Sequence, residues 1–331
     1  MARTVGGMAG NDVGRLMLAD TPSLYFRAFY GVPRSVRAPD GTPVGAVRGL
    51  VDTLARQLVE VRPWGLVACF DADWRPAFRV ALLPSYKAHR VAGGASAGGA
   101  AGALAVDVEE VEDELEVQLP IIDAVLDAFG IARVSAAGFE ADDVIGTLSA
   151  RHRGEVDILT GDRDLFQLVD DAAGVRVRYA VERFAVVDEA SVAARYGIPG
   201  RAYADFAVLR GDPSDGLPGV AGVGAKTAAA LLGRFGSLAG LLAALDEAGP
   251  SGVVEGVSAG VRRRLEGARE YLRAAVPVVA VVRDVQVGVV DAALPAVPVD
   301  VGAVAALGER WGLAGSCARL VEALRVVAAR E

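Results

Sequence analysis

The alternation of short apolar runs with longer stretches of helical periodicity constrains this chain most. Apolar residues dominate 15–20, 65–71, 131–135 and 156–162, whereas 44–61, 117–129 and 141–151 carry apolar side chains at helical spacing. This order predicts an α/β fold, with a mostly parallel central sheet and helices on both faces. From residue 191 onward the pattern is helical and punctuated by glycine, which predicts a separate helical region.

Two stretches are predicted to lack a fixed structure. Residues 1–14 are rich in glycine and have no apolar run before a cleavage site, which is typical of a disordered tail rather than an export signal. Residues 91–106 hold no charged side chain and consist mostly of Gly and Ala, so backbone entropy favours a flexible segment. We therefore expect an α/β core over 15–190, interrupted by this segment, and a helical region over 191–331.

The composition excludes several classes of protein. Two cysteines and two histidines cannot form a disulfide framework or a Cys/His zinc cluster. No apolar run approaches the roughly 20 residues of a spanning helix, so we expect no membrane partner. Because no export signal is found, a cytoplasmic location is expected. We also expect a monomer. The net charge is −8, yet residues 27–90 hold ten basic and five acidic side chains. A basic face for nucleic acid can therefore coexist with an acidic pocket.

Acidic residues recur at the ends of the predicted strands. Asp20, Asp71 and Asp162 each close an apolar run. The carboxyl ends of parallel strands share one edge, where open α/β sheets bind ligands, so these side chains are expected to converge. Carboxylates gathered there would repel one another by about 4 kcal/mol per pair at about 4 Å and an effective dielectric near 20. Six further candidates occur in short motifs: Glu140, Asp142, Asp143, Asp164, Asp212 and Asp215.

This donor set favours hard divalent cations. Oxygen ligands without His or Cys suit Mg²⁺ or Mn²⁺, and two such ions can activate water and stabilise the leaving oxygen of a phosphodiester. Taken singly, each acid is more commonly a turn or helix-cap residue. Taken together, with Asp142 and Asp143 followed by Asp162 and Asp164, they favour a metal site.

Residues 217–235 have the form of a helix-hairpin-helix. A short helix is expected before Gly222 and Gly224, and a second helix opens with Lys226 and Thr227. Glycines allow the backbone to approach a phosphate, and free N–H groups at a helix start bind it without reading sequence. The alternative is a glycine-rich link between two helices.

Residues 78–90 (FRVALLPSYKAHR) combine basic and aromatic side chains. Arg79, Lys87 and Arg90 flank Tyr86. Basic residues with an aromatic platform are typical of a channel for single-stranded nucleic acid, although solvated basic faces are also common. His89 is interpreted as a surface residue rather than a ligand.

In combination, these motifs resemble the metal-dependent 5′ nucleases, which include the 5′ nuclease domain of bacterial DNA polymerase I, phage 5′ exonucleases and flap endonucleases. The resemblance covers about residues 16–245 and rests on LADTPSLYFRAFYG, FRVALLPSYKAHR, GFEADDVIG, TGDRDLFQLV and GDPSDGLPGVAGVGAKTA, in the family's order. It implies a PIN-like 5′ nuclease fold whose nine acids form the metal site.

The resemblance also implies roles for individual residues. Asp142 and Asp162 would be essential for catalysis, Lys87 and Arg90 would face the scissile phosphate, and Tyr86 would stack on a terminal base. The hairpin would bind duplex DNA and could hold a K⁺ ion.

The sequence departs from the family at two places. Gly216 stands where relatives commonly have Asn, and 91–106 lacks the basic residues of the relatives' helical arch. We therefore expect a less firmly held second metal and weak gripping of a flap. With 331 residues there is no room for a polymerase domain, which predicts a stand-alone nuclease or an excised fragment.

The sequence thus predicts a structure-selective 5′ nuclease that uses Mg²⁺ or Mn²⁺ to cut flaps, nicks or recessed 5′ ends of DNA, or RNA in hybrids. One alternative is a catalytically inactive scaffold that holds branched DNA through the hairpin. Another is an α/β phosphohydrolase that draws on Asp71 and Asp73, which is disfavoured because it leaves the hairpin without a role.

Overall fold

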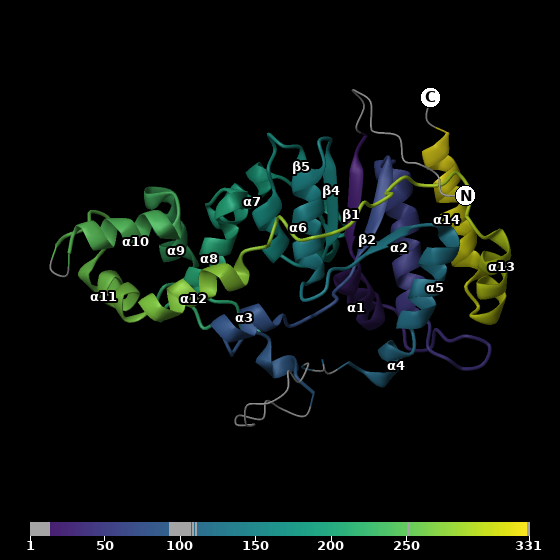
Figure 1. The fold of residues 1–331 in the computed structure, drawn as a ribbon, viewed down its shortest axis with the longest axis horizontal. Helices are drawn as coiled ribbons and strands as arrows, with labels where there is room; N and C mark the ends of the chain where they lie inside the picture. Colours follow the sequence, from purple (N-terminus) through teal and green to yellow (C-terminus); the bar gives the residue numbers. More distant parts are fainter. Residues whose placement is uncertain (1–13, 93–106, 108, 110, 250–251, 330–331) are drawn as a thin grey trace.

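The computed structural model describes residues 14–92, 107, 109, 111–249 and 252–329. In these residues one sheet contains β1 (Leu16–Asp20), β2 (Gly65–Cys69), β3 (Ala132–Val134), β4 (Val156–Thr160), β5 (Val175–Tyr179) and β6 (Ala185–Val187), in the order β3-β2-β1-β4-β5-β6 (Figure 1). Neighbouring strands from β3 to β5 are parallel, and β6 pairs antiparallel with β5. The chain leaves the central strand β1 toward β2 and later returns to its other side as β4, which creates the crevice typical of doubly wound sheets.

Successive residues of β1 belong to two different hydrophobic cores, because side chains of a strand alternate between the faces of a sheet. Leu16 and Leu18 pack with α6 (Ala141–Arg151) and the helices between residues 189 and 279, whereas Met17 and Ala19 pack with α2 (Gly45–Val61) and α5 (Leu119–Phe129). All five residues of β1, β2 and β4 are buried. The predicted sheet with helices on both faces is confirmed.

Local sequence signals set the helix ends near the crevice. Asp20 is the N-cap of α1 (Thr21–Gly31), and its carboxylate accepts from the Ser23 N–H. Glu140 and Asp143 form a capping box at the start of α6. Gly130 ends α5 in the left-handed conformation, at φ 74°. The same acids that were proposed as metal ligands therefore also begin helices.

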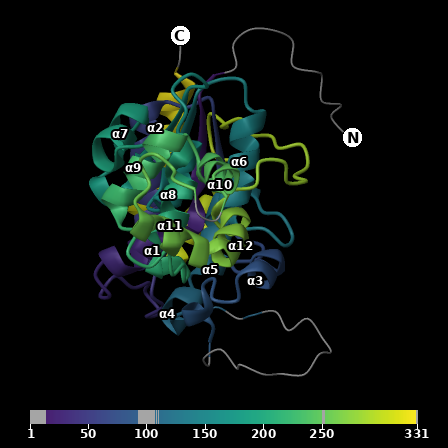
Figure 2. The same ribbon diagram turned by 90° about the vertical axis from the view of Figure 1, so that its left-hand side faces the viewer.

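A helical part lies at one end of the molecule (Figure 1). It contains α8 (Tyr203–Arg210), α9 (Ala225–Phe235), α10 (Leu238–Glu247), α11 (Ala259–Gly267) and α12 (Arg269–Val279), and α7 (Glu189–Tyr196) lies between it and the sheet. Viewed from that end, the short helices α3 (Ala77–Leu82) and α4 (Asp113–Glu116) both lie toward the lower edge (Figure 2).

The C-terminal helices lie elsewhere than predicted. After α12 the chain runs back over the sheet-bearing part without regular structure, and α13 (Val301–Arg310) and α14 (Ala314–Ala328) pack on α5 and α2 (Figure 1). Leu313, Leu320 and Leu324 belong to the same core as α2. Residues 301–329 therefore complete the α/β part instead of extending the helical region.

The predicted strands and helices up to residue 162 are confirmed to within three residues at each end. The short helix expected before Gly222 is absent, since residues 217–221 contain no helix. The helices that precede the hairpin are α8 and the 3₁₀ helix Pro213–Asp215. Residues 1–13 of the predicted tail and most of the flexible segment, 93–106, lie outside the described residues. None of the described helices is by itself long and apolar enough to cross a membrane, and α9 with α10 reaches that composition only as a pair bent by 73°.

Candidate active site

A pocket of about 610 Å³ opens at the carboxyl ends of β1, β2 and β4. Five of the nine predicted acids line it, which places residues from four sequence motifs around one cavity. These five acids are Asp20, Asp71, Glu140, Asp142 and Asp162. The structure therefore brings the three strand-end acids into one cavity.

Asp20 and Asp162 are tied to each other through Thr160 at the end of β4. The Thr160 hydroxyl donates to Asp20 Oδ2 at 2.5 Å and accepts from the Asp162 N–H at 2.8 Å. Asp20 Oδ1 accepts from the Ser23 N–H at 3.2 Å. One hydrogen-bond network thus joins the end of β4, the start of α1 and the two acids.

Burial and like charges both act on these acids. Burial, followed by the charges of Asp162 and Asp71, raises the pKa of Asp20 to about 7, although its hydrogen bonds favour the ionised form. The surrounding protein raises the pKa of Asp71 to about 6, because desolvation outweighs the attraction of Lys87. Burial, Asp20 and Asp162 raise the pKa of Asp142 well above its usual range. Without a cation, the folded protein therefore favours the neutral form of these carboxyl groups.

Lys87 lines the same pocket as the acids. Its ammonium pairs with Glu140 Oε1 and lies 5.1 Å from the centroid of the Tyr86 ring. Burial alone would lower the pKa of Lys87, but Glu140 and neighbouring acids outweigh it and raise that pKa well above its usual range. Its backbone is left-handed, at φ 49°, and its N–H donates to the Asp215 carbonyl at 3.0 Å. Strain at a pocket residue held by such a contact is typical of a functional site.

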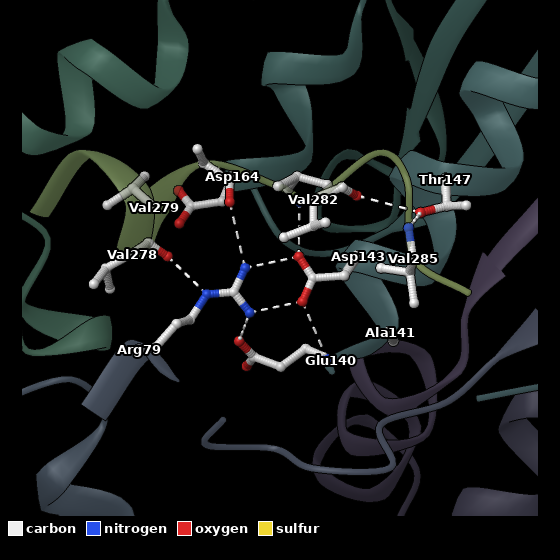
Figure 3. Close-up of polar contacts among 12 residues, drawn as sticks. Arg79, Glu140, Ala141, Asp143, Thr147, Asp164, Val278, Val279, Val282 and Val285 are labelled. Atoms are coloured by element: carbon white, nitrogen blue, oxygen red, sulfur yellow. Dashed lines mark hydrogen bonds and ion pairs between the residues drawn. The ribbon is translucent and has the colours of Figure 1, made fainter. Parts of the chain in front are cut away.

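Three predicted site residues are in different surroundings from those expected. Arg79 was predicted to contact DNA, but it is only 2 % exposed and pairs with Glu140 and Asp143 (Figure 3). Asp143 was predicted to bind metal, but it is fully buried and both of its oxygens face Arg79. Tyr86 was predicted to stack on a base, but it is 5 % exposed and donates its hydroxyl to Glu140 Oε2 at 2.8 Å.

The remaining predicted acids lie beside the pocket rather than on its wall. Asp215 pairs with Arg90 at 3.2 Å, and Arg90 itself lines the pocket. Asp212 is buried, accepts from the Ser214 N–H at 3.0 Å and pairs with Arg210 at 3.1 Å. Asp164 follows Asp162 at the start of a 3₁₀ turn, and burial raises its pKa well above the usual range.

Several lining residues were not predicted. Glu109, from the acidic stretch after the flexible segment, adds a sixth carboxylate, and burial raises its pKa. Phe26, Tyr30 and Trp74 form an aromatic part of the wall, and Arg163 adds a basic group. The aromatic residues of 24–30 follow Asp20 by one to three helical turns, so helical spacing after a strand-end acid was the signal available for Phe26 and Tyr30.

The donor chemistry of the pocket fits divalent cations. Its acids offer only oxygen ligands, and positive charge would relieve the desolvation and repulsion that raise the pKa values of Asp20, Asp71 and Asp142. In the part of the chain that is described, no three acidic, His or Cys side chains meet at the distances of a coordination sphere. Mutual repulsion, together with the hydrogen bonds above, accounts for side chains that share a cavity without converging on one point.

The glycine hairpin lies in the helical part, on an exposed turn. Gly222 is left-handed at φ 74°, and Gly224 is the N-cap of α9. Lys226 is exposed and Thr227 half-buried in the first turn of that helix. The Gly222 carbonyl accepts from Arg264 of α11 at 3.1 Å.

Comparisons with known proteins place the chain among nucleases. Residues 15–197 match a family model described as "5'-3' exonuclease, N-terminal resolvase-like domain", and 198–301 match "5'-3' exonuclease, C-terminal SAM fold". A 5'-3' exonuclease of Streptomyces coelicolor is 57% identical over 93% of this chain and 99% of the relative. One of Mycobacterium tuberculosis is 48% identical over 93% and 97%, and DNA polymerase I of that species is 39% identical over 70% of this chain but 24% of its own length.

Solved structures share the fold. A T5 5'-exonuclease with zinc bound matches with a TM-score of 0.59 at 17% identity, covering 95% of this chain and 99% of that chain. A flap endonuclease of Methanococcus jannaschii matches with a TM-score of 0.55 at 14% identity, covering 95% and 93%. At these identities the likeness supports the fold described above.

Proposed function

Because this chain belongs to the 5′-3′ exonuclease family and is a 5′ nuclease, we propose that the acid-lined pocket is its active site. We propose that its substrates are branched or 5′-ended DNA, including flaps, nicks and recessed ends. RNA in hybrids is proposed as a further substrate. One observation carries this proposal. Acids from β1, β2, β4 and α6 share a single pocket with Lys87 and Arg90.

Mg²⁺ or Mn²⁺ would be held by the acids that line the pocket. Asp20, Asp71, Asp142 and Asp162 are the residues proposed for this role, with Glu140 at the margin because its carboxylate is already shared by Lys87, Tyr86 and Arg79. When bound, such ions activate water and stabilise the leaving oxygen of a phosphodiester. The chain's contribution is to keep these carboxylates in place despite their repulsion.

Lys87 and Arg90 are proposed to bind the scissile phosphate. Both line the pocket, and each is paired with a carboxylate, Glu140 and Asp215 respectively. A phosphate arriving in the pocket would meet two cations that are already oriented, and charge that develops on its oxygens would be stabilised by donors fixed in advance. The aromatic wall formed by Phe26, Tyr30 and Trp74 is apolar surface suited to the bases on either side.

The hairpin is proposed to bind the duplex part of the substrate, at a place separate from the pocket. Gly222, Gly224, Lys226 and Thr227 present an exposed turn and the start of α9 to a phosphate. A K⁺ ion fits these residues poorly, because Arg264 already places positive charge on the Gly222 carbonyl. We propose that Arg264 supplies that charge and that duplex binding needs no potassium.

The test is cleavage of a 5′-labelled flap duplex with Mn²⁺ and with EDTA. The proposal expects product only with metal, and no product from Asp142→Ala or Asp162→Ala, while both variants still bind the duplex. Wild-type cleavage by either variant would refute the site assignment. Binding without product at saturating Mn²⁺ would favour the inactive scaffold, and turnover of small phosphomonoesters would favour the phosphohydrolase.

A further inference from the structure

Arg79 is enclosed by acids and backbone, and it contacts Glu140, which lines the pocket (Figure 3). Its Nη1 donates to Glu140 Oε2 at 2.6 Å and to Asp143 Oδ2 at 2.7 Å, and Nη2 donates to Asp143 Oδ1 at 2.7 Å. Its Nε donates to the Val278 carbonyl at 2.8 Å. The guanidinium fork therefore holds two carboxylates and the last turn of α12 at once.

One of these carboxylates is the group that holds Lys87. Glu140 offers Oε2 to Arg79 and to the Tyr86 hydroxyl, and it offers Oε1 to the Lys87 ammonium. Glu140 is almost fully buried, so its orientation depends on these three donors and on the capping box of α6. An ordered path of contacts runs from Arg79 through Glu140 to a pocket cation.

The other carboxylate fixes the start of α6 and the return segment after α12. Asp143 completes the capping box of α6, and its Oδ1 accepts from the Val282 N–H at 2.9 Å (Figure 3). Thr147, one turn further along α6, accepts from the Val285 N–H at 3.0 Å. Asp143 and the Val278 carbonyl therefore both hold Arg79, and these contacts fix its position without Glu140.

Stability alone does not explain this arrangement. Buried ion pairs gain little over well-packed apolar side chains of similar volume, because desolvation offsets the attraction. A guanidinium fork is needed where two carboxylates must be held at fixed angles, and a point charge cannot replace it. At 2 % exposure Arg79 cannot touch DNA, so any effect on turnover must pass through a neighbour.

We propose that Arg79 is a positioning residue of the nuclease, which orients Glu140 and thereby places the Lys87 ammonium in the pocket. The inference rests on the proposed role of Lys87 in binding the scissile phosphate. It adds a residue that acts without contact to substrate or metal.

The chain offers a direct spectroscopic test, because Lys87 and Lys226 are its only lysines. With ¹⁵N-labelled lysine, the metal-free protein without DNA should give two ammonium signals, of which Lys87 exchanges slowly because it is enclosed and paired. In Arg79→Met the Lys87 signal should shift or broaden away, while that of exposed Lys226 should stay. An unchanged Lys87 signal in the folded variant would overturn the inference.

Turnover is measured on Arg79→Lys, which keeps the charge and the fold should the Met variant be unstable. We expect kcat to fall about tenfold to a hundredfold with KM within about twofold, because the ammonium cannot hold Glu140 and Asp143 together. The matched control is Arg178→Lys: Arg178 is similarly enclosed, at 7 % exposure, and pairs with Asp157 and Glu60, which do not line the pocket. That variant should keep the wild-type kcat and KM.

A double variant separates positioning from a general structural role. In the Lys87→Ala background, Arg79→Lys should lower kcat no further, because the group that it positions is gone. Equal losses in both backgrounds would refute action through Lys87. Wild-type kcat in Arg79→Lys would refute the inference while leaving the proposed function intact, since that function fails only if the acid variants cut.

Discussion

Asp71 Oδ1 accepts a hydrogen bond of 2.7 Å from the Ala141 N–H, which joins the end of β2 to the first residue of α6. The carboxylate therefore has two separable roles, as an acceptor at a helix start and as a charge in the pocket. Asn keeps a carbonyl oxygen at the same place but carries no charge, whereas Ala lacks both.

We therefore expect Asp71→Asn and Asp71→Ala to be equally inactive but unequally stable. Leaving the Ala141 N–H without its acceptor should cost about 1 kcal/mol of unfolding free energy relative to Asn. Denaturant unfolding in EDTA measures the role of the hydrogen bond in stability. Flap cleavage in Mn²⁺ measures the role of the charge in activity. Equal stability of the two variants would show that the hydrogen bond contributes nothing.

Asp142→Asn should be inactive and yet more stable than the wild type without metal. The side chain of Asp142 has no hydrogen bond to any described residue, and it faces the charges of Asp20 and Asp162 in a desolvated site. Removing its charge should raise the unfolding free energy in EDTA by about 1 kcal/mol, or Tm by about 1–2 °C. If Asp142 is a ligand, Mg²⁺ should raise the Tm of the wild type more than that of the variant. Thermal unfolding with and without Mg²⁺ measures this difference. An equal rise in Tm for both proteins would show that Asp142 is not a ligand.

Thr160→Val tests whether a neutral hydroxyl organises the acids. The valine has a similar shape but can neither donate to Asp20 nor accept from the Asp162 N–H. We expect a loss of about 1–3 kcal/mol in stability and weaker binding of Mn²⁺. Thr160→Ser keeps the hydroxyl and is the control. Titration with Mn²⁺ measures the affinity of both variants. Equal affinity in Thr160→Val and Thr160→Ser would contradict the argument.

The strand-end acids could be predicted because periodicity fixes which edge of the sheet a residue reaches. Asp20, Asp71 and Asp162 needed only the alternation of strands and helices. Strand β5 was not predicted, because Arg176 and Arg178 interrupt its apolar pattern and are balanced by the buried Asp157 on β4.

The burial of Arg79 could not be predicted for a related reason. Its partner Asp143 lies 64 positions away, and an arginine in a basic stretch gives no sign of whether it meets solvent or an acid. Contacts between distant segments decide that question, and a single sequence does not encode them as a periodic pattern. The same holds for Tyr86, whose ring packs into the core beside the pocket.

Gly216 should resist replacement by Asn. Its φ of 72° suits either residue, but a Cβ would lie 2.1 Å from the Ser85 carbonyl oxygen. Because Ser85 precedes Tyr86 and Lys87, the displaced backbone should move the Lys87 ammonium, and we expect kcat to fall about tenfold or more.

Gly138→Asn is the matched control for that change. Gly138 is also left-handed, at φ 78°, and no atom lies within 4 Å of the place that a Cβ would take there, so the substitution should leave cleavage intact. Single-turnover cleavage of both variants at saturating Mn²⁺ checks the argument. Wild-type turnover in Gly216→Asn would mean that the loop yields without disturbing Lys87, and the close approach to Ser85 would then have no part in catalysis.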